Sequence, residues 1–152
     1  MGNPWIVDAN APDAAPTINL VHEYIDEHGD AQRHPLWLKV RAELSVGEHR
    51  RMLKSVTSLS QAVRPRGAAD ATAEARFEWT EYSFARMEAY IIDWSLAHEP
   101  NLPRLKPTRV SYEALREEVF DLIDGALDAH EQVAADRKKA RATSPKPDAT
   151  SA

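Results

Sequence analysis

Histidine is the residue type in this chain best suited to bind a metal ion, and its spacing decides whether a metal site is expected. The six histidines are His22, His28, His34, His49, His98 and His130. They form neither a His-x-x-x-His pair nor a His-Glu-x-x-His motif, the helical patterns that bring two imidazoles to one ion. His22 with Glu23 and Asp26 would share an ion only if that segment were helical. Since the chain also has no cysteine for thiolate ligands or disulfides, we expect neither a metal ion nor a cofactor.

Three aspartates near the C-terminus have the spacing of a paired acid and base. Asp121, Asp124 and Asp128 fall at positions i, i+3 and i+7, so a helix places them on one side. They are either a catalytic or ion-binding group, or a solvated face opposite the apolar positions Leu122 and Leu127. A catalytic carboxylate needs a pocket that shifts its pKa, and the sequence signals none. With no phosphate-binding glycine loop and no Gly-x-Ser-x-Gly motif, we expect a solvated face, no catalytic residue and no enzyme activity.

Basic residues gather at two places. Arg41, Arg50 and Arg51 either grip an acidic partner or a phosphate backbone, or form an ordinary solvated patch, which we favour. From residue 131 to residue 152 there are five basic and three acidic residues, a local charge of +2. The whole chain carries −5, so we expect no nucleic-acid partner.

The N-terminal segment holds three adjacent apolar residues, Trp5, Ile6 and Val7, in a stretch that is otherwise polar and rich in proline. Such residues either fold back onto the domain or dock on a partner. We take Trp5, Ile6 and Val7 as the candidate partner-binding residues.

Composition divides the chain of 152 residues into three parts. We expect an extended arm over residues 1–16, a single globular domain over residues 17–139 and a disordered basic tail over residues 140–152. No apolar run approaches the ~20 residues that cross a membrane, and the start of the chain shows no signal peptide. We therefore expect an intracellular protein without a membrane partner.

Alternating and helical patterns predict an α+β fold dominated by helices. Residues 36–44 alternate as a β-strand, and residues 17–27 fit either a strand or a short helix. Gly29 and Pro35 break the pattern between them, which predicts an N-terminal β-hairpin. Ser45 and Glu48 form a capping box, which predicts a helix over residues 46–61.

Two more principal helices are expected beyond a linker over residues 63–75. The first runs over residues 80–97, where Phe84, Met87, Ile91 and Trp94 share one face and Arg86 falls mostly on the other.

The second follows an extended, proline-rich loop over residues 99–109, and we expect Ser111 to cap it. Gly125 inside this helix suggests a close helix crossing or a slight kink. The predicted core residues are Leu38, Val40, Leu53, Val56, Phe84, Met87, Ile91, Trp94, Leu115, Val119, Leu122 and Leu127.

Three segments in this order carry a family resemblance: LWLKVRAELSVGEHRRML, EYSFARMEAYIIDWSL and YEALREEVFDLIDGALDAH. Over roughly residues 17–133 the chain resembles the tail assembly chaperones of long-tailed bacteriophages and prophages.

The resemblance implies a protein of the host bacterial cytoplasm that catalyses no reaction. Such chaperones bind the long, apolar tape measure protein and help recruit tail tube subunits around it. The alternative is a structural head–tail connector or tail component that stays in the virion. An enzyme or metal protein is the third and least favoured class.

Overall fold

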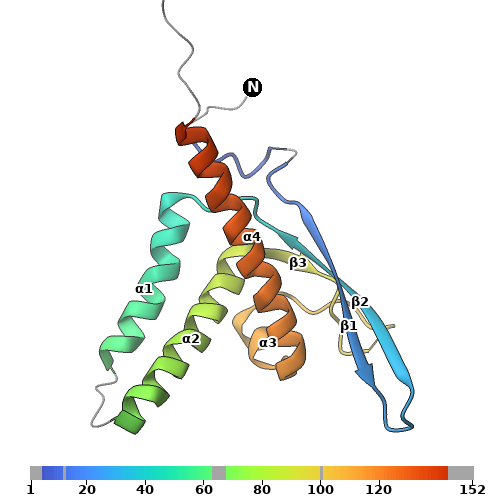
Figure 1. Ribbon diagram of the computed structural model, residues 1–152. Helices are drawn as coiled ribbons and strands as arrows, with labels where there is room; N and C mark the ends of the chain where they lie inside the picture. Colours follow the sequence, from blue (N-terminus) through green and yellow to red (C-terminus); the bar gives the residue numbers. More distant parts are fainter. Residues whose placement is uncertain (1–4, 12, 63–67, 100, 144–152) are drawn as a thin grey trace, which may run out of the picture.

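The computed structural model describes residues 5–11, 13–62, 68–99 and 101–143, with the backbone alone described for residues 55–62 and 68–78. The fold is α+β, with 47% of the residues in helices. A three-stranded antiparallel sheet of order β1-β2-β3 packs against helices on one face (Figure 1). The elements are β1 (Thr17–Ile25), β2 (Ala31–Val40), α1 (Val46–Ala62), α2 (Ala68–Tyr90), β3 (Ile91–Trp94), α3 (Arg109–Glu113) and α4 (Glu117–Thr143).

The predicted β-hairpin is confirmed. β1 pairs with β2 through nine consecutive residue pairs, from Thr17 opposite Lys39 to Ile25 opposite Ala31. β2 therefore begins before residue 36 and ends at residue 40, earlier at both ends than the predicted strand. The turn closes at Gly29, whose φ of 80° is available to glycine without steric cost.

The predicted helix over residues 80–97 is wrong at both ends. α2 begins at Ala68, inside the predicted linker, and ends at Tyr90. The next four residues form β3, an antiparallel neighbour of β2 in which Trp94 lies opposite Leu38. Ile91 and Trp94 are buried in the structure, and burial was expected of them in a helix as well as in a strand. Their spacing alone therefore did not distinguish a helix from a strand. Pairing with β2 and two adjacent β-branched residues favour the strand.

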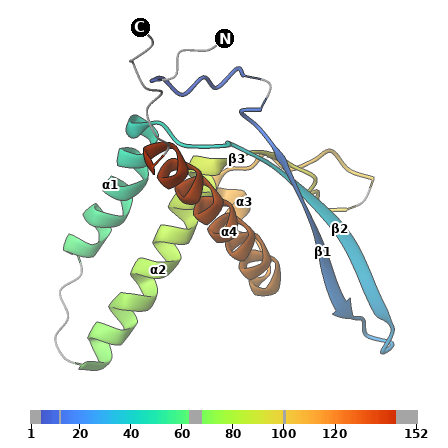
Figure 2. The ribbon, with the colours of Figure 1, turned by 45° about the horizontal axis from the view of Figure 1, so that its top comes forward.

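The helices lie on one side of the sheet, and α1 and α2 form an antiparallel helical pair that extends beyond it (Figure 1). α4 contacts both α2 and β1, and α3 contacts α2. α1 packs on α2, and both run away from the sheet (Figures 1 and 2). The far end of the β1–β2 hairpin projects away from the helices on the opposite side (Figure 2).

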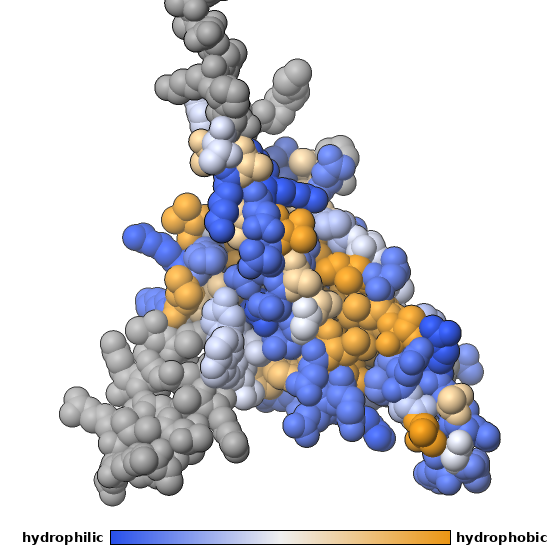
Figure 3. Space-filling view, viewed as in Figure 1, coloured by the Kyte–Doolittle hydropathy of each residue, from blue (hydrophilic) through white to orange (hydrophobic). Residues whose placement is uncertain are grey.

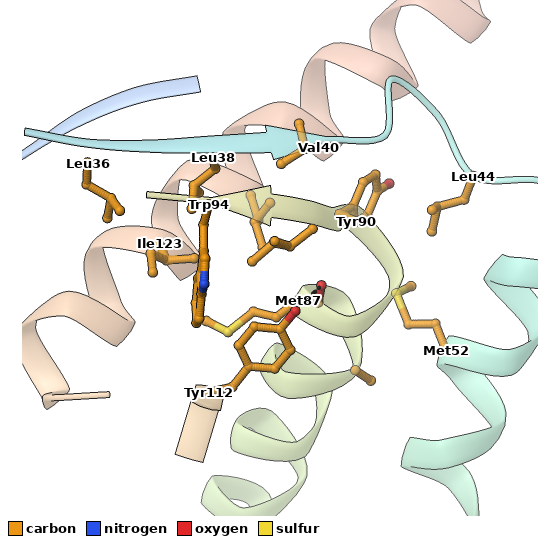
Figure 4. Packing of buried hydrophobic residues seen from close by; sticks show 13 residues of the cluster. Leu36, Leu38, Val40, Leu44, Met52, Met87, Tyr90, Trp94, Tyr112 and Ile123 are labelled. Carbon is orange, nitrogen blue, oxygen red and sulfur yellow. Dashed lines mark hydrogen bonds between the residues drawn. The ribbon is translucent and has the colours of Figure 1, made fainter. Parts of the chain in front are cut away.

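The core lies between the sheet and α2, α3 and α4 (Figure 4). Of the predicted core residues, six are buried and confirmed: Leu38, Val40, Met87, Ile91, Trp94 and Leu127. Four are half-buried: Phe84, Leu115, Val119 and Leu122. The prediction for Leu53 is wrong, because its side chain is 45% exposed and its neighbour Met52 enters the core instead. The side chain of Val56 lies outside the described residues.

The two predicted helix caps have different outcomes. The hydroxyl of Ser45 accepts the N–H of Glu48 at 3.2 Å, so the predicted start of α1 is confirmed. Ser111 caps no helix: it lies inside α3, where its hydroxyl donates to the carbonyl of Lys106 at 2.6 Å. α4 begins at Glu117 instead.

The last helix also differs from its prediction at Gly125 and at its end. A Cβ at Gly125 would meet no atom within 4 Å, so no close crossing requires this glycine. α4 continues through residues 140–143 of the expected tail, and residues 144–152 lie outside the described part of the chain.

Candidate functional site

A group of charges surrounds Arg86 on α2. This side chain is only 4% exposed, and Asp124, Asp128 and Glu131 of α4 lie 2.6, 3.1 and 3.2 Å from its guanidinium nitrogens. The prediction of a solvated face is therefore wrong for Asp124, which is half-buried against this arginine. Asp128 also pairs with Arg86, but its side chain stays 77% exposed, as expected. Asp121 is exposed, as expected.

The protonation states of this cluster suit a structural role. Burial lowers the pKa of Arg86, but the bonds from Asp124 and Glu131 outweigh burial and raise the pKa above its usual value. Burial first, and the charge of Glu131 second, raise the pKa of Tyr82 and bring the pKa of Tyr90 to about 12. All three groups keep their protons at neutral pH, so the cluster ties α2 to α4 and is not poised to exchange protons.

A second arginine ties α3 to α2. The guanidinium of Arg109 lies 2.6 Å from Glu81, 3.3 Å from Glu88 and 2.9 Å from Glu113. It also stands 4.2 Å from the centre of the Phe84 ring, a cation–π distance. Bonds to Glu81 and Glu113 outweigh burial and raise the pKa of this arginine. This cluster too fixes one helix on another.

The histidines are spread over the molecule. The Nε2 atom of His130 lies 2.7 Å from the carbonyl oxygen of Arg41, which links α4 to the end of β2. His22, Tyr24 and His34 stack on the hairpin, with 5.2 and 5.4 Å between ring centres. Within the described ranges, no three histidine, aspartate or glutamate residues are arranged to hold a metal ion.

The N-terminal arm presents the candidate partner-binding residues. Ala42 donates its N–H to the carbonyl of Ala14 at 2.8 Å, which holds the base of the arm against the chain after β2. Trp5 is 90% exposed and Ile6 68% exposed, while Val7 is half-buried. The sequence left open whether these residues fold back onto the domain or face outward. In the structure Trp5 and Ile6 are exposed, and Val7 is packed partly against the domain.

A groove of about 330 Å³ lies beneath this arm. Val7 and the exposed Ile92 contribute apolar surface to it, and Arg137 and Arg141 of α4 contribute positive charge. Arg41 also lines the groove and pairs with Glu48 at 3.6 Å. Arg141 likewise faces Glu43 at 3.9 Å, so these two arginines are already matched by carboxylates and do not form a site built for phosphate.

Several large apolar side chains are exposed over the described surface. They are Trp5, Ile6, Val21, Tyr24, Ile25, Val46, Leu53, Trp79, Ile92, Leu102, Val110 and Val133. Apolar surface gathers between α4 and the β1–β2 hairpin (Figure 3). Sequence analysis missed the hairpin part of this surface, although Ile18 and Val21 showed that both faces of this segment carry apolar residues.

Searches with protein-family models, among curated proteins and among solved structures found no match to this chain. In the part of the chain that the structure describes, no helix is long and apolar enough to cross a membrane.

Proposed function

We propose that this protein is a phage tail assembly chaperone. It binds the tape measure protein in the host bacterial cytoplasm and helps recruit tail tube subunits, without catalysis. The observation that carries the proposal is the exposure of Trp5 and Ile6 on an arm whose base is held to the domain. The resemblance of residues 17–133 to these chaperones gives the client its identity.

The surface around the arm has the chemistry that such a client requires. A long helical client exposes apolar stripes, and adjacent aromatic and aliphatic side chains cover such stripes in helix-recognition sites. Trp5 offers the large contact area typical of binding hot spots. Ile92 and Val7 extend the apolar surface into the groove beneath the arm.

Coexpression with the tape measure protein tests this proposal. We expect the chain to keep the client soluble and to copurify with it. The double variant Trp5→Ala/Ile6→Ala should lose both effects while its urea unfolding midpoint stays unchanged, because these side chains lie outside the core. Val110→Ala is the matched control, since Val110 on α3 is 77% exposed and apolar but lies in another element.

Two results would contradict the proposal. In one, the double variant retains the client as well as the wild type and the control do. In the other, mass spectrometry of purified virions finds stoichiometric copies of the chain, which would indicate a head–tail connector or tail component instead.

A further inference from the structure

β1 has a free edge in the described part of the chain. It is the outer strand of the sheet, and among the described residues only β2 pairs with it. The N–H of Val40 bonds to the carbonyl of Pro16, and the N–H of Asp26 bonds to the carbonyl of Asp30. In an antiparallel pair such bonded positions alternate, so the even-numbered residues of β1 bond to β2. The backbone groups that point away from β2 belong to Thr17, Asn19, Val21, Glu23 and Ile25.

This edge lacks the usual protection against another strand. Exposed edges are normally blocked by charged side chains, especially lysine, by proline or by a bulge. The sequence of β1 from Thr17 to Ile25 contains neither lysine nor proline, and its register with β2 is unbroken. Its one acidic residue, Glu23, is paired with Arg33 of β2 at 3.0 Å. Val21 is 42% exposed and Ile25 is 74% exposed on the face turned away from the helices. An edge of this length and composition readily accepts a further strand.

We infer that β1 pairs with β1 of a second copy of this chain, antiparallel and centred on Val21. The two copies then share a six-stranded sheet, with about ten backbone hydrogen bonds across the new junction. In this register Val21 lies opposite its own copy, and Glu23 lies opposite Asn19. The carboxamide of Asn19 donates to a carboxylate, so no like charges face each other across the junction.

A groove beside the edge fits the same register. It measures about 450 Å³ and is lined by His22, Glu23, Tyr24, Ile25, Arg116, Glu118 and Val119. On the face toward the helices, Ile18 of the second copy lies beside Tyr24, and Leu20 of the second copy lies beside His22. The apolar side chains of Ile18 and Leu20 from the second copy thus lie at this groove. Because the dimer is two-fold symmetric, the same residues of the first copy lie at the groove of the second copy. The apolar surface between α4 and the hairpin continues toward this edge (Figure 3).

Cysteine cross-linking tests the register directly, because the chain has no cysteine of its own. In the Val21→Cys variant the two cysteines should lie about 5.5 Å apart between Cα atoms, within the range of a disulfide. In the Ile25→Cys control they should be roughly 27 Å apart along the paired strands. We expect oxidation to give a covalent dimer of Val21→Cys and to form no disulfide cross-link between copies of Ile25→Cys. Equal or faster cross-linking of Ile25→Cys, the more exposed position, would overturn the inference.

Light scattering with size-exclusion chromatography supplies the second readout. We expect the wild type to be a dimer at micromolar concentration. Val21→Lys and Val21→Glu should each be monomeric, because the substitution places two like charges opposite each other, and mixing the two variants should restore a dimer. A monomeric wild type, or a dimer that both single variants retain, would show that β1 does not pair with a second copy.

Discussion

Arg86 is buried with its charge, and the three carboxylates of α4 compensate for its desolvation. If Arg86→Met removes that charge, Asp124 and Glu131 stay half-buried without their partner. Breaking a buried ion pair by removing one partner costs about 3–5 kcal/mol. We therefore expect Arg86→Met to lower the free energy of unfolding by about this amount, measured by urea denaturation.

Asp128 provides the control for this cluster, because its side chain is 77% exposed. An exposed partner of an ion pair contributes about 1 kcal/mol or less. We expect Asp128→Asn to change the free energy of unfolding only within that range. Equal losses in Asp128→Asn and Arg86→Met would mean that burial does not govern the cluster.

Tyr90 makes the free energy of unfolding depend on pH in the alkaline range. Burial, followed by the charge of Glu131, raises its pKa from 10.0 to about 12. Because the folded state holds the phenol proton of Tyr90 more tightly than the unfolded state does, this group stabilises the folded protein. The contribution is fully present below pH 10 and is lost as the pH rises through the folded-state pKa of about 12. We expect the free energy of unfolding to fall between these pH values, and the fall to be smaller in Tyr90→Phe. Identical pH profiles of the two proteins would exclude Tyr90 as a cause.

The sequence alone did not predict the Arg86 cluster, because Arg86 lies on α2 and its carboxylate partners lie on α4, and the packing of these two helices is not encoded locally. Arg86 is 38 residues from Asp124, and helical phase placed it opposite the Phe84 and Met87 face. One local signal was present: Tyr82 and Tyr90 lie four residues before and after Arg86, on the same face. Aromatic residues on the Arg86 face as well as on the Phe84 face indicate that both faces of α2 are buried.

At the level of elements, two glycines have opposite backbone requirements. Gly125 lies inside α4 with open space where a Cβ would stand. Gly29 has a φ of 80°, which an L-residue with a Cβ adopts only at a cost. We expect Gly125→Ala to raise the free energy of unfolding by about 1 kcal/mol and Gly29→Ala to lower it by about 1 kcal/mol.

Thermal and urea denaturation of the two single variants measures both effects under one set of conditions. A loss of stability in Gly125→Ala would show that α4 makes a close contact at this glycine after all. An unchanged stability in Gly29→Ala would show that the turn adopts another conformation.

The hairpin and the start of α1 were predictable because their signals are local: alternation, a turn glycine and a capping serine. β3 was not, because a strand of four residues is too short to show a period. Its pairing with β2 connects residues that are more than fifty positions apart, such as Leu38 and Trp94. Tertiary pairing, rather than local preference, ends α2 at Tyr90.

At the scale of the whole molecule, charge opposes the proposed self-association. Each copy carries a net charge of −5 at pH 7, so two copies repel each other at long range. The proposed junction offsets this repulsion with backbone hydrogen bonds and apolar contacts, and it pairs the carboxylate of Glu23 with the uncharged Asn19. Salt should therefore screen the repulsion and leave the attraction almost unchanged.

We expect the dimer to become tighter as sodium chloride rises from low to physiological concentration. Over that range the Debye length shrinks from about 30 Å to about 8 Å, so the negative surfaces of the two copies cease to interact beyond the junction itself. Sedimentation equilibrium at several salt concentrations and at pH 7 measures the dissociation constant. A dissociation constant that increases with salt would mean that ion pairs hold the two copies together. The interface would then lie away from β1, whose outward positions bring no opposite charges together.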